Sequence, residues 1–462
     1  MKKVLYIFLF FFPVFAFPQE PWFKSSPLDY AWKNVGNAGF SAGETDWINF
    51  AFSPTDGQPY VAYEDFGNAG KVTVMKFDGT NWVNVGNAGF SEGMGEFTSL
   101  ALNPSGQPFV AFRDESNSSK VTVMKYDGTN WECVGSAGFS KGAAEYISLA
   151  ISPSGQPFVA FEDYGNSKKV TVMKFDGVNW VDVGVEGISA GESTMLDLAF
   201  SHAGIPYITY FDYGGGDSLK VMKFDSTNWV NVGTSGISYG LVLYPKLAFS
   251  PTDQPYLAFA DETTNPHGKA SVMNFSTSNW YYIGNEGFSV GSAMHPDIAF
   301  SPSGELFIVY VDGGSLFSAT VMKYEGQNWV TLGNEGFSAG EVDNTNLAFN
   351  SSGVPYVAYQ DNANGSKATV MKYDSVYMGI NELHQSTLSL YPNPATDKIT
   401  IETSSTSTPS QLSIDNLSGE EVMNCQVIKS KMQIDISSLA SGVYIVRLIN
   451  DKTVEVGKFV KK

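Results

Sequence analysis

Residues Lys71–Gly86 read KVTVMKFDGTNWVNVG, and near-copies of this stretch recur along most of the 462-residue chain. A fixed repeat of this kind, with a period of about 50 residues, is typical of propellers and of solenoids built from stacked units. The copies place a tryptophan every 49 to 51 residues, at Trp32, Trp82, Trp131, Trp180, Trp229, Trp280 and Trp329, with Met378 where an eighth would fall. The chain is therefore a repeat protein.

Each repeat has the pattern of four short strands separated by turn residues. In the second repeat we expect strands at residues 97–103, 108–114, 121–126 and 130–135. Asp127 and Gly128, between the last two, tolerate the positive φ that a tight hairpin turn requires. Four strands in about 49 residues match the size of a propeller blade, and no segment has the apolar period of a helix. The sequence predicts an all-β fold, a seven-bladed β-propeller.

The two ends of the repeat array complement each other. The array begins with an isolated fourth strand at residues 31–36 and ends at residues 371–378, where a fourth strand is missing. Pairing these ends would leave neither strand edge free to aggregate. We therefore predict that residues 31–36 complete the last blade and close a ring that spans residues 31–378.

The N-terminal end has the features of an export signal. Lys2 and Lys3 precede an apolar run over residues 4–17, and Val14 and Ala16 are suitable small residues for signal peptidase. The run is too short to cross a bilayer as a helix, and no later stretch is a better candidate. We predict a signal peptide at residues 1–16, a leader at residues 17–30, no transmembrane segment, and an exported, soluble monomer.

Charge and cysteine content exclude several classes of partner and several kinds of site. The formal net charge is −19, and Arg113 and Arg447 are the only arginines, so nucleic acid and anionic membrane surfaces are disfavoured as partners. Cys133 and Cys425 are the only cysteines and fall in different predicted domains, so we expect no structural disulfide. Two cysteines are too few for a thiolate metal site, and we expect no metal and no cofactor.

The pattern changes after residues 379–387, which read as a polar linker. Residues 388–462 contain no copy of the repeat and carry alternating strands, which predict a small β-sandwich. The motifs LYPNPA at 390–395, SGVYIVRL at 441–448 and KFVKK at 458–462 resemble those of the C-terminal sorting domain of type IX (Por) secretion substrates. The resemblance implies the type IX machinery as a partner and a secreted or outer-membrane-attached location at the cell surface. It implies no activity.

Features that repeat in all seven blades are interpreted as scaffold. The loops before the first strands carry G-[FI]-S-x-G, whose apolar residue reads as a structural wedge with glycine supplying positive φ. An aspartate ends each second strand and is interpreted as a turn cap, although a ring of seven carboxylates also suits cations. These aspartates are Asp65, Asp114, Asp163, Asp212, Asp261, Asp312 and Asp361.

Positions that break the sevenfold pattern are better candidates for function. One position near the start of each first strand carries Trp47, Phe97, Tyr146, Met195, Tyr244, His295 and Asn344. Two residues further along, every blade has a polar residue: Asn49, Ser99, Ser148, Asp197, Lys246, Asp297 and Asn346. Aromatic faces beside hydrogen-bonding groups suit a sugar, whereas blade packing around a hydrated channel is the alternative interpretation. The candidate ligand-binding residues are Trp47, Phe97, Tyr146, Tyr244, Lys246 and His295.

Catalytic motifs are sparse. There is no H-E-x-x-H pattern, and His267 and His295, the two histidines expected on the candidate face, lie in unlike contexts. A glycosidase or lyase would need a carboxylate pair, for which Asp197, Asp297 and Glu145 are the candidates. The leading hypothesis is a non-catalytic surface protein that binds glycan or protein. A polysaccharide-active enzyme and a structural scaffold remain alternatives, because fold alone does not decide function.

Overall fold

The computed structural model describes residues 29–233, 237–238, 240–263, 268–376, 388–403, 410–417, 419–427, 429–449 and 454–462. The predicted signal peptide, most of the leader and the linker at 379–387 lie outside these residues. The chain divides into two compact units, one of which spans Tyr30–Asp374 and the other of which contains Ser375–Lys462. Each unit is described separately below.

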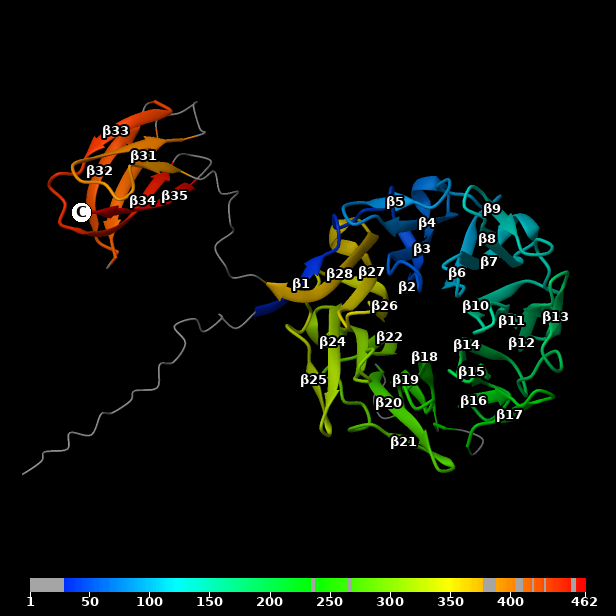
Figure 1. The fold of residues 1–462 in the computed structure, drawn as a ribbon. Helices are drawn as coiled ribbons and strands as arrows, with labels where there is room; N and C mark the ends of the chain where they lie inside the picture. The colour runs from blue at the N-terminus through cyan, green and yellow to red at the C-terminus, as the bar shows by residue number, and fades with distance from the viewer. Residues whose placement is uncertain are drawn as a thin grey trace, which may run out of the picture. The chain divides into compact units, whose positions relative to one another are not determined.

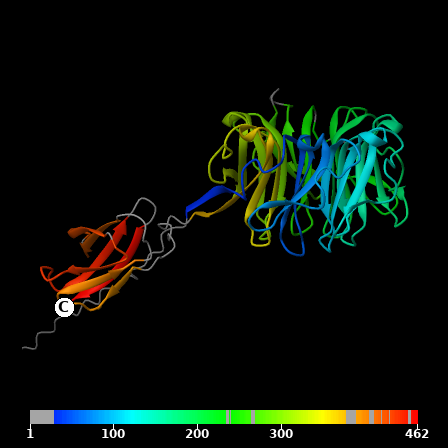
Figure 2. The same ribbon diagram turned by 90° about the horizontal axis from the view of Figure 1, so that it is seen from above.

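Seven four-stranded antiparallel sheets form the first unit, which confirms the predicted β-propeller. Figure 1 shows the sheets arranged around a common centre with the first strand of each sheet innermost. Seen after a 90° turn, the blades stand side by side around the ring (Figure 2). The first strands are β2 (Thr45–Phe52), β6 (Gly95–Leu102), β10 (Ala144–Ile151), β14 (Ser193–Phe200), β18 (Val242–Phe249), β22 (Ala293–Phe300) and β26 (Val342–Phe349).

The second and third strands of each blade form its buried middle. Their alternating valines, leucines and isoleucines pack against both neighbouring blades; Val61, for example, is fully buried. The second strands are β3 (Pro59–Asp65), β7 (Pro108–Asp114), β11 (Pro157–Asp163), β15 (Pro206–Asp212), β19 (Pro255–Asp261), β23 (Leu306–Asp312) and β27 (Pro355–Asp361). The third strands are β4 (Lys71–Phe77), β8 (Lys120–Tyr126), β12 (Lys169–Phe175), β16 (Ser218–Phe224), β20 (Lys269–Ser276), β24 (Ser318–Glu325) and β28 (Lys367–Val376).

The fourth strands are short and carry the repeated tryptophan between blades, as predicted. The Trp131 ring stacks on Phe90 of a GFSxG loop with ring centroids 4.1 Å apart, and its Nε1 donates to the Val85 carbonyl at 2.7 Å. The apolar residue of these loops is thus a wedge against the next tryptophan. The fourth strands formed in sequence are β5 (Trp82–Asn84), β9 (Trp131–Cys133), β13 (Trp180–Asp182), β17 (Trp229–Asn231), β21 (Asn279–Tyr282) and β25 (Asn328–Thr331).

The N-terminal strand closes the ring. The last blade has the strand order β1-β28-β27-β26, in which β1 (Asp29–Asn34) is the outermost strand. Trp32 stacks on Phe337 at 4.0 Å and donates from Nε1 to the Leu332 carbonyl at 3.0 Å, the same contacts that join the other blades. The predicted ring closure is confirmed, and β1 begins two residues before the predicted strand.

Five of the seven aspartates that end the second strands accept a backbone amide hydrogen of the following turn, as predicted, and Asp65 and Asp361 do not. Asp163 accepts from the Gly165 amide at 2.9 Å and from Thr171 Oγ1 at 3.1 Å, and it is buried. Asp65 and Asp361 accept from side chains only, namely Asn68 and Thr73 in one case and Asn364 and Thr369 in the other, and their Oδ1 atoms have no hydrogen-bond partner among the described residues. The turns that follow include the 3-10 helices η1 (Phe66–Asn68), η2 (Glu115–Asn117), η3 (Tyr164–Asn166), η4 (Gly313–Ser315) and η5 (Asn362–Asn364).

The second unit contains two sheets around one apolar core, as a small β-sandwich requires. The sheets have the orders β29-β30-β33 and β32-β31-β34-β35. Ile399 and Ile434 of one sheet and Leu412 and Phe459 of the other share a core. Its strands are β29 (Ser389–Tyr391), β30 (Lys398–Glu402), β31 (Ser410–Asn416), β32 (Glu421–Val427), β33 (Lys431–Asp435), β34 (Gly442–Ile449) and β35 (Val454–Lys461).

Candidate functional site

Every first strand of the propeller carries a β-bulge at the same position. In β2 the register with β3 shifts between Asp46 and Asn49, which leaves an extra residue on the inner strand. The bulged residue has a left-handed backbone conformation that non-glycine residues seldom adopt. These residues are those selected above for breaking the pattern: Trp47 (φ 50°), Phe97 (50°), Tyr146 (48°), Met195 (51°), Tyr244 (53°), His295 (45°) and Asn344 (52°).

Six of these seven side chains line one cavity of about 270 Å³ at the propeller axis. Five of the six predicted ligand-binding residues line it. Four of them are bulged residues, and the fifth, Lys246, occupies the polar position two residues further along its strand. Phe97 is the exception: it does not line the cavity but lies between Trp47 and Tyr146, with ring centroids 4.2 and 5.3 Å away. The lining residues include Trp47, Tyr146, Met195, Tyr244, Lys246, His295, Asn344 and Asn346.

The aromatic residues form two groups on different sides of the axis. Trp47, Phe97 and Tyr146 follow one another on the first three blades. Tyr244 and His295 form a separate pair on the fifth and sixth blades, with ring centroids 4.0 Å apart and an interplanar angle of 32°. The cavity is therefore lined by aromatic side chains from two separate sets of blades.

Two carboxylates at the edge of the cavity were not predicted. Asp343 Oδ1 lies 3.0 Å from His295 Nε2 and accepts from the Asn344 amide at 3.0 Å. Asp46 Oδ1 accepts from Trp47 N at 2.7 Å and from Asn344 Nδ2 at 2.9 Å. Both aspartates directly precede a bulged residue, so the only sequence signal for them is their place beside the pattern-breaking position.

Their surroundings shift the pKa values of these two carboxyl groups in opposite directions. Burial is the largest influence on Asp46 and raises its pKa despite the hydrogen bonds from Trp47 and Asn344. Burial also acts to raise the pKa of Asp343, but the hydrogen bond and charge of His295 outweigh it and hold that pKa below its usual value. One group is therefore easier to protonate than an ordinary aspartate, and the other harder.

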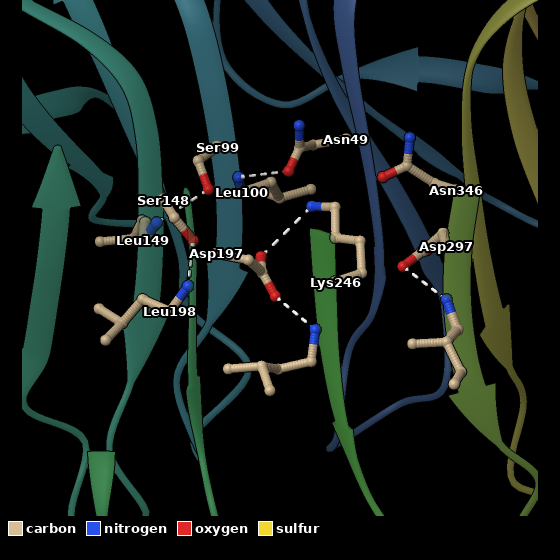
Figure 3. A network of polar contacts seen from close by, with 12 residues as sticks. Asn49, Ser99, Leu100, Ser148, Leu149, Asp197, Leu198, Lys246, Asp297 and Asn346 are labelled. Atoms are coloured by element: carbon tan, nitrogen blue, oxygen red, sulfur yellow. Dashed lines mark hydrogen bonds and ion pairs between the residues drawn. The ribbon is translucent and has the colours of Figure 1, made fainter. Parts of the chain in front are cut away.

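The polar residues two positions beyond the bulge form a ring that joins the blades (Figure 3). Ser148 Oγ accepts from the Leu198 amide of the next blade at 3.0 Å, and Ser99 Oγ accepts from the Leu149 amide at 2.9 Å. Such side-chain bonds satisfy backbone groups where neighbouring first strands meet without a ladder between them. The residues of this polar ring, predicted to face the channel, thus also hold neighbouring blades together.

Asp197 and Asp297 are members of this polar ring. Asp197 Oδ2 accepts from the Leu247 amide at 3.0 Å, and Asp297 Oδ2 accepts from the Leu347 amide at 2.7 Å. Burial raises the pKa of Asp297 against the opposing charge of Lys246. Neither aspartate lines the cavity. Their catalytic role remains a prediction, and their contacts show that both join blades.

Glu145 directly precedes the bulged residue Tyr146, as Asp46 and Asp343 precede theirs, but it lies in an ion-pair cluster. Its Oε1 is 3.3 Å from Arg113 Nη1, and Arg113 also pairs with Glu96 at 3.3 Å and Glu115 at 2.9 Å. The single arginine of the propeller is therefore surrounded by three carboxylates that link the second and third blades. Glu145 as a catalytic residue likewise remains a prediction.

The serine of the G-[FI]-S-x-G motif holds its loop in place. Although this spacing also fits the pattern of a serine-hydrolase nucleophile, Ser91 is buried, donates to the Gly93 carbonyl at 2.6 Å and accepts from the Val72 amide at 3.0 Å. The corresponding serines of five other loops repeat these contacts, as at Ser140, whereas the buried Ser238 hydroxyl has no hydrogen-bond partner within the part of the chain that the structure describes. The motif belongs to the scaffold.

The remaining histidines do not join the site in the described residues. His202 lies beside a second cavity of about 470 Å³ on the opposite face, where its Nδ1 is 3.3 Å from Asp253. His267 and His384 lie outside the described residues. Within the described ranges, no cluster of His, Cys, Asp or Glu has an arrangement that suits a metal ion. No helix there has the length and apolar character needed to cross a bilayer.

Comparison with solved structures finds propeller-containing proteins at low sequence identity. One is PorZ, an essential surface component of the type IX secretion system of Porphyromonas gingivalis (12% identity, TM-score 0.38, 87% of this chain and 64% of PorZ covered). This chain therefore spans less than two thirds of PorZ. Others are an α-L-arabinanase of Penicillium chrysogenum complexed with arabinobiose (14%, TM-score 0.40, 60% and 92%) and a mutant Aleuria aurantia lectin with Fucα1-6GlcNAc (16%, TM-score 0.42, 66% and 100%).

Sequence comparison identifies only the C-terminal unit. No curated protein matches this chain. Residues 389–462 match the family described as the secretion system C-terminal sorting domain, which agrees with the three motifs noted above. Residues 389–462 are therefore a type IX sorting domain, and the protein that carries it is a secreted or cell-surface protein.

Proposed function

We propose that this protein is a non-catalytic saccharide-binding protein whose ligand enters the axial cavity of the propeller. The observation that carries the proposal is the cavity itself: Trp47, Tyr146, Tyr244 and His295 converge there from four blades, although they are far apart in sequence. Its volume of about 270 Å³ is slightly below the roughly 300 Å³ at which the usual range for small-molecule sites begins, so the cavity suits a small ligand.

The chemistry of the lining supports a sugar over an apolar ligand. Trp47 and Tyr244 offer flat faces for the C–H surface of a pyranose. Lys246 supplies donors, while Asn344 and Asn346 each commit their amide NH2 to protein oxygens and leave a carbonyl group for a ligand hydroxyl. A mixture of stacking faces, donors and acceptors is what a polyhydroxylated ligand requires.

Backbone strain at the same residues gives further support. A left-handed conformation is unfavourable for large side chains by roughly 1 kcal/mol or more, and such conformations concentrate at functional sites. Seven blades adopt it, yet they carry six different residue types there, with tyrosine the only one that occurs twice. A purely structural requirement would favour Gly or Asn throughout, whereas a binding site explains the bulky, varied set.

The proposal is tested by replacing aromatic residues with asparagine. Asn344 has φ 52° at the equivalent position, so Trp47→Asn and Tyr244→Asn fit the bulge without added strain. We expect the double variant to lose at least tenfold in glycan affinity, about 1.4 kcal/mol or more, through lost stacking. The measurement is a glycan array with the full-length protein, followed by calorimetric titration of the glycans that bind.

Tyr281→Asn is the matched control. Tyr281 is 51% exposed on β21 at the outer rim, so its loss removes an aromatic residue without touching the cavity. Circular dichroism and melting temperature establish that all variants are folded. A folded Trp47→Asn and Tyr244→Asn variant that binds like the wild type would refute the site.

A second candidate function is a polysaccharide-active enzyme, a glycosidase or lyase. It is favoured by one observation: the Asp46 and Asp343 carboxyls at the cavity edge have pKa shifts of opposite sign, as an acid and a base require. Incubation with a broad polysaccharide panel would then release new reducing or unsaturated ends, and Asp343→Asn would abolish them. Absence of any product with the wild-type protein excludes this candidate for the panel used.

A further inference from the structure

Lys246 is the one member of the polar ring that does not bond to the backbone of the following blade. Five ring residues accept an amide hydrogen from the next blade, as Ser148 does from Leu198. The sixth, Asn346, donates from Nδ2 to the Ile48 carbonyl at 2.8 Å. A protonated lysine has no acceptor to offer. The residues that accept are Asn49, Ser99, Ser148, Asp197 and Asp297.

The fold compensates for this exception. The amide that Lys246 leaves without an inter-blade acceptor belongs to Ile298, and it donates to Oδ1 of its own neighbour Asp297 at 3.0 Å. Asp297 thus accepts two backbone hydrogens, one from Ile298 and one from Leu347. The seam between the fifth and sixth blades therefore holds without a contribution from Lys246.

Lys246 is instead available to the cavity. Only Lys246 and Asn346 of the ring residues line it, and the Lys246 side chain is 42% exposed to solvent. Figure 3 shows the side chain extending toward Asp197, whose Oδ1 is 3.3 Å from Nζ. An ammonium group has three donors, so two remain beyond the Asp197 contact for a bound molecule.

The charges around Lys246 oppose an anionic ligand. Asp197 and Asp297 flank it within the ring, and both raise its pKa, Asp197 more strongly. Asp46 and Asp343 lie at the cavity edge. The two basic side chains of the lining already have carboxylate partners, since Lys246 pairs with Asp197 and His295 with Asp343, so a ligand carboxylate or sulfate would have to compete with these aspartates. A hydroxyl group takes a hydrogen bond from the ammonium without adding charge.

We propose that Lys246 is the specificity-determining residue of the axial cavity, that it donates hydrogen bonds to hydroxyl groups of an uncharged saccharide, and that the site rejects uronic acids and sulfated sugars. The inference rests on the proposed saccharide-binding function and names the class of its ligand. It assigns opposite roles to two touching residues: Lys246 binds the sugar, and Asp197 keeps its positive charge from attracting anions.

Two variants separate these roles. Lys246→Gln removes the ammonium, and Asp197→Asn removes its counter-charge while Asn keeps an acceptor for the Leu247 amide, as Asn49 does for Leu100. The probes are methyl glycosides of glucose, galactose and mannose and those of the corresponding uronic acids. Binding is followed by calorimetry and by tryptophan fluorescence, and folding by melting temperature.

We expect wild-type protein to bind at least one neutral glycoside at least tenfold more tightly than its uronic acid. Lys246→Gln should lower the affinity for that neutral glycoside at least tenfold. Asp197→Asn should raise the affinity for the uronic acid relative to the affinity for the neutral glycoside. Tighter wild-type binding of uronic acids, or unchanged neutral binding by folded Lys246→Gln, overturns the inference and leaves the binding function standing. Failure of every glycoside to bind the wild type overturns the binding function as well.

Discussion

Glu64 is a carboxyl group that the fold buries among other carboxylates. It is 3% exposed in β3 and lies opposite Asp46 in β2. Burial, followed by the charges of Glu96, Asp46 and Glu115, raises the pKa of Glu64 to about 8. The corresponding residue of the last blade is Gln360, an uncharged side chain that donates to the Thr45 carbonyl. At neutral pH Glu64 is therefore mostly a neutral acid, chemically close to that glutamine.

Glu64→Gln is predicted to stabilise the protein in alkaline solution. Because the pKa of Glu64 is higher in the folded state than in the unfolded chain, its stabilising contribution is present at low pH and is lost as the pH rises to about 8. The variant should gain on the order of 3 kcal/mol in unfolding free energy at pH 8.5 and little at pH 4.5. Urea denaturation at both values measures this, with exposed Glu44→Gln as the control. An equal gain at both values would contradict it.

Part of the cavity is predictable residue by residue. Trp47, Tyr146, Tyr244 and His295 stand out because they depart from a sevenfold pattern, and such variety is not expected at a position that only repeats the scaffold. Phe97 departs from the pattern equally, yet its ring is taken up between two neighbours. Sequence spacing does not distinguish these outcomes, because they depend on which way each side chain turns.

Among elements, the bulged first strand decides where the site forms. An extra residue in the inner strand re-aims its side chain and sharpens the local twist. The alternation of apolar and polar residues predicts the strand but not the bulge, because no glycine marks it. For this reason Asp46 and Asp343, one residue before the bulge, could not be assigned to the cavity edge from the sequence.

Met195→Val is predicted to destabilise the fourth blade. Met195 has φ 51°, and a β-branched residue is more strained in that conformation than methionine. We expect a loss of roughly 1–2 kcal/mol in unfolding free energy, measured by urea denaturation. Met195→Asn removes the same contact between the sulfur atom and the Tyr244 amide but suits the conformation, so it serves as the control. Equal losses of unfolding free energy in the two variants would show that the destabilisation comes from lost side-chain contacts and not from backbone strain at the bulge.

At the scale of the whole molecule, ring closure joins residues from opposite ends of the propeller. The bond from Trp32 to Leu332 spans 300 residues, and Val35 N donates to the Val370 carbonyl at 2.8 Å. Closure was predictable, because one spare strand and one missing strand are countable in the repeat. A ligand site could not be predicted in the same way. Which side chains converge on the axis depends on their orientation, and the repeat period does not determine that orientation.

Trp32→Ala is predicted to open the ring locally. The substitution should lower the unfolding free energy by roughly 3 kcal/mol, as truncation of a large packed aromatic residue does. Trp180→Ala removes equivalent contacts in the interior of the ring and is the matched control. Hydrogen exchange should show faster exchange of β1 and β28 in Trp32→Ala alone. Comparable protection of these strands in both variants would mean that β1 is not the weak point of the ring.

Placing both ends of the propeller in one blade has a mechanical consequence. Tension applied through these ends acts first on β1 and β28, since the other six blades have no free end. That same blade carries Asn344 and Asn346, which form part of the cavity wall. Tension on the two ends of the propeller is therefore expected to disturb the blade that carries this part of the cavity wall before it disturbs the other six.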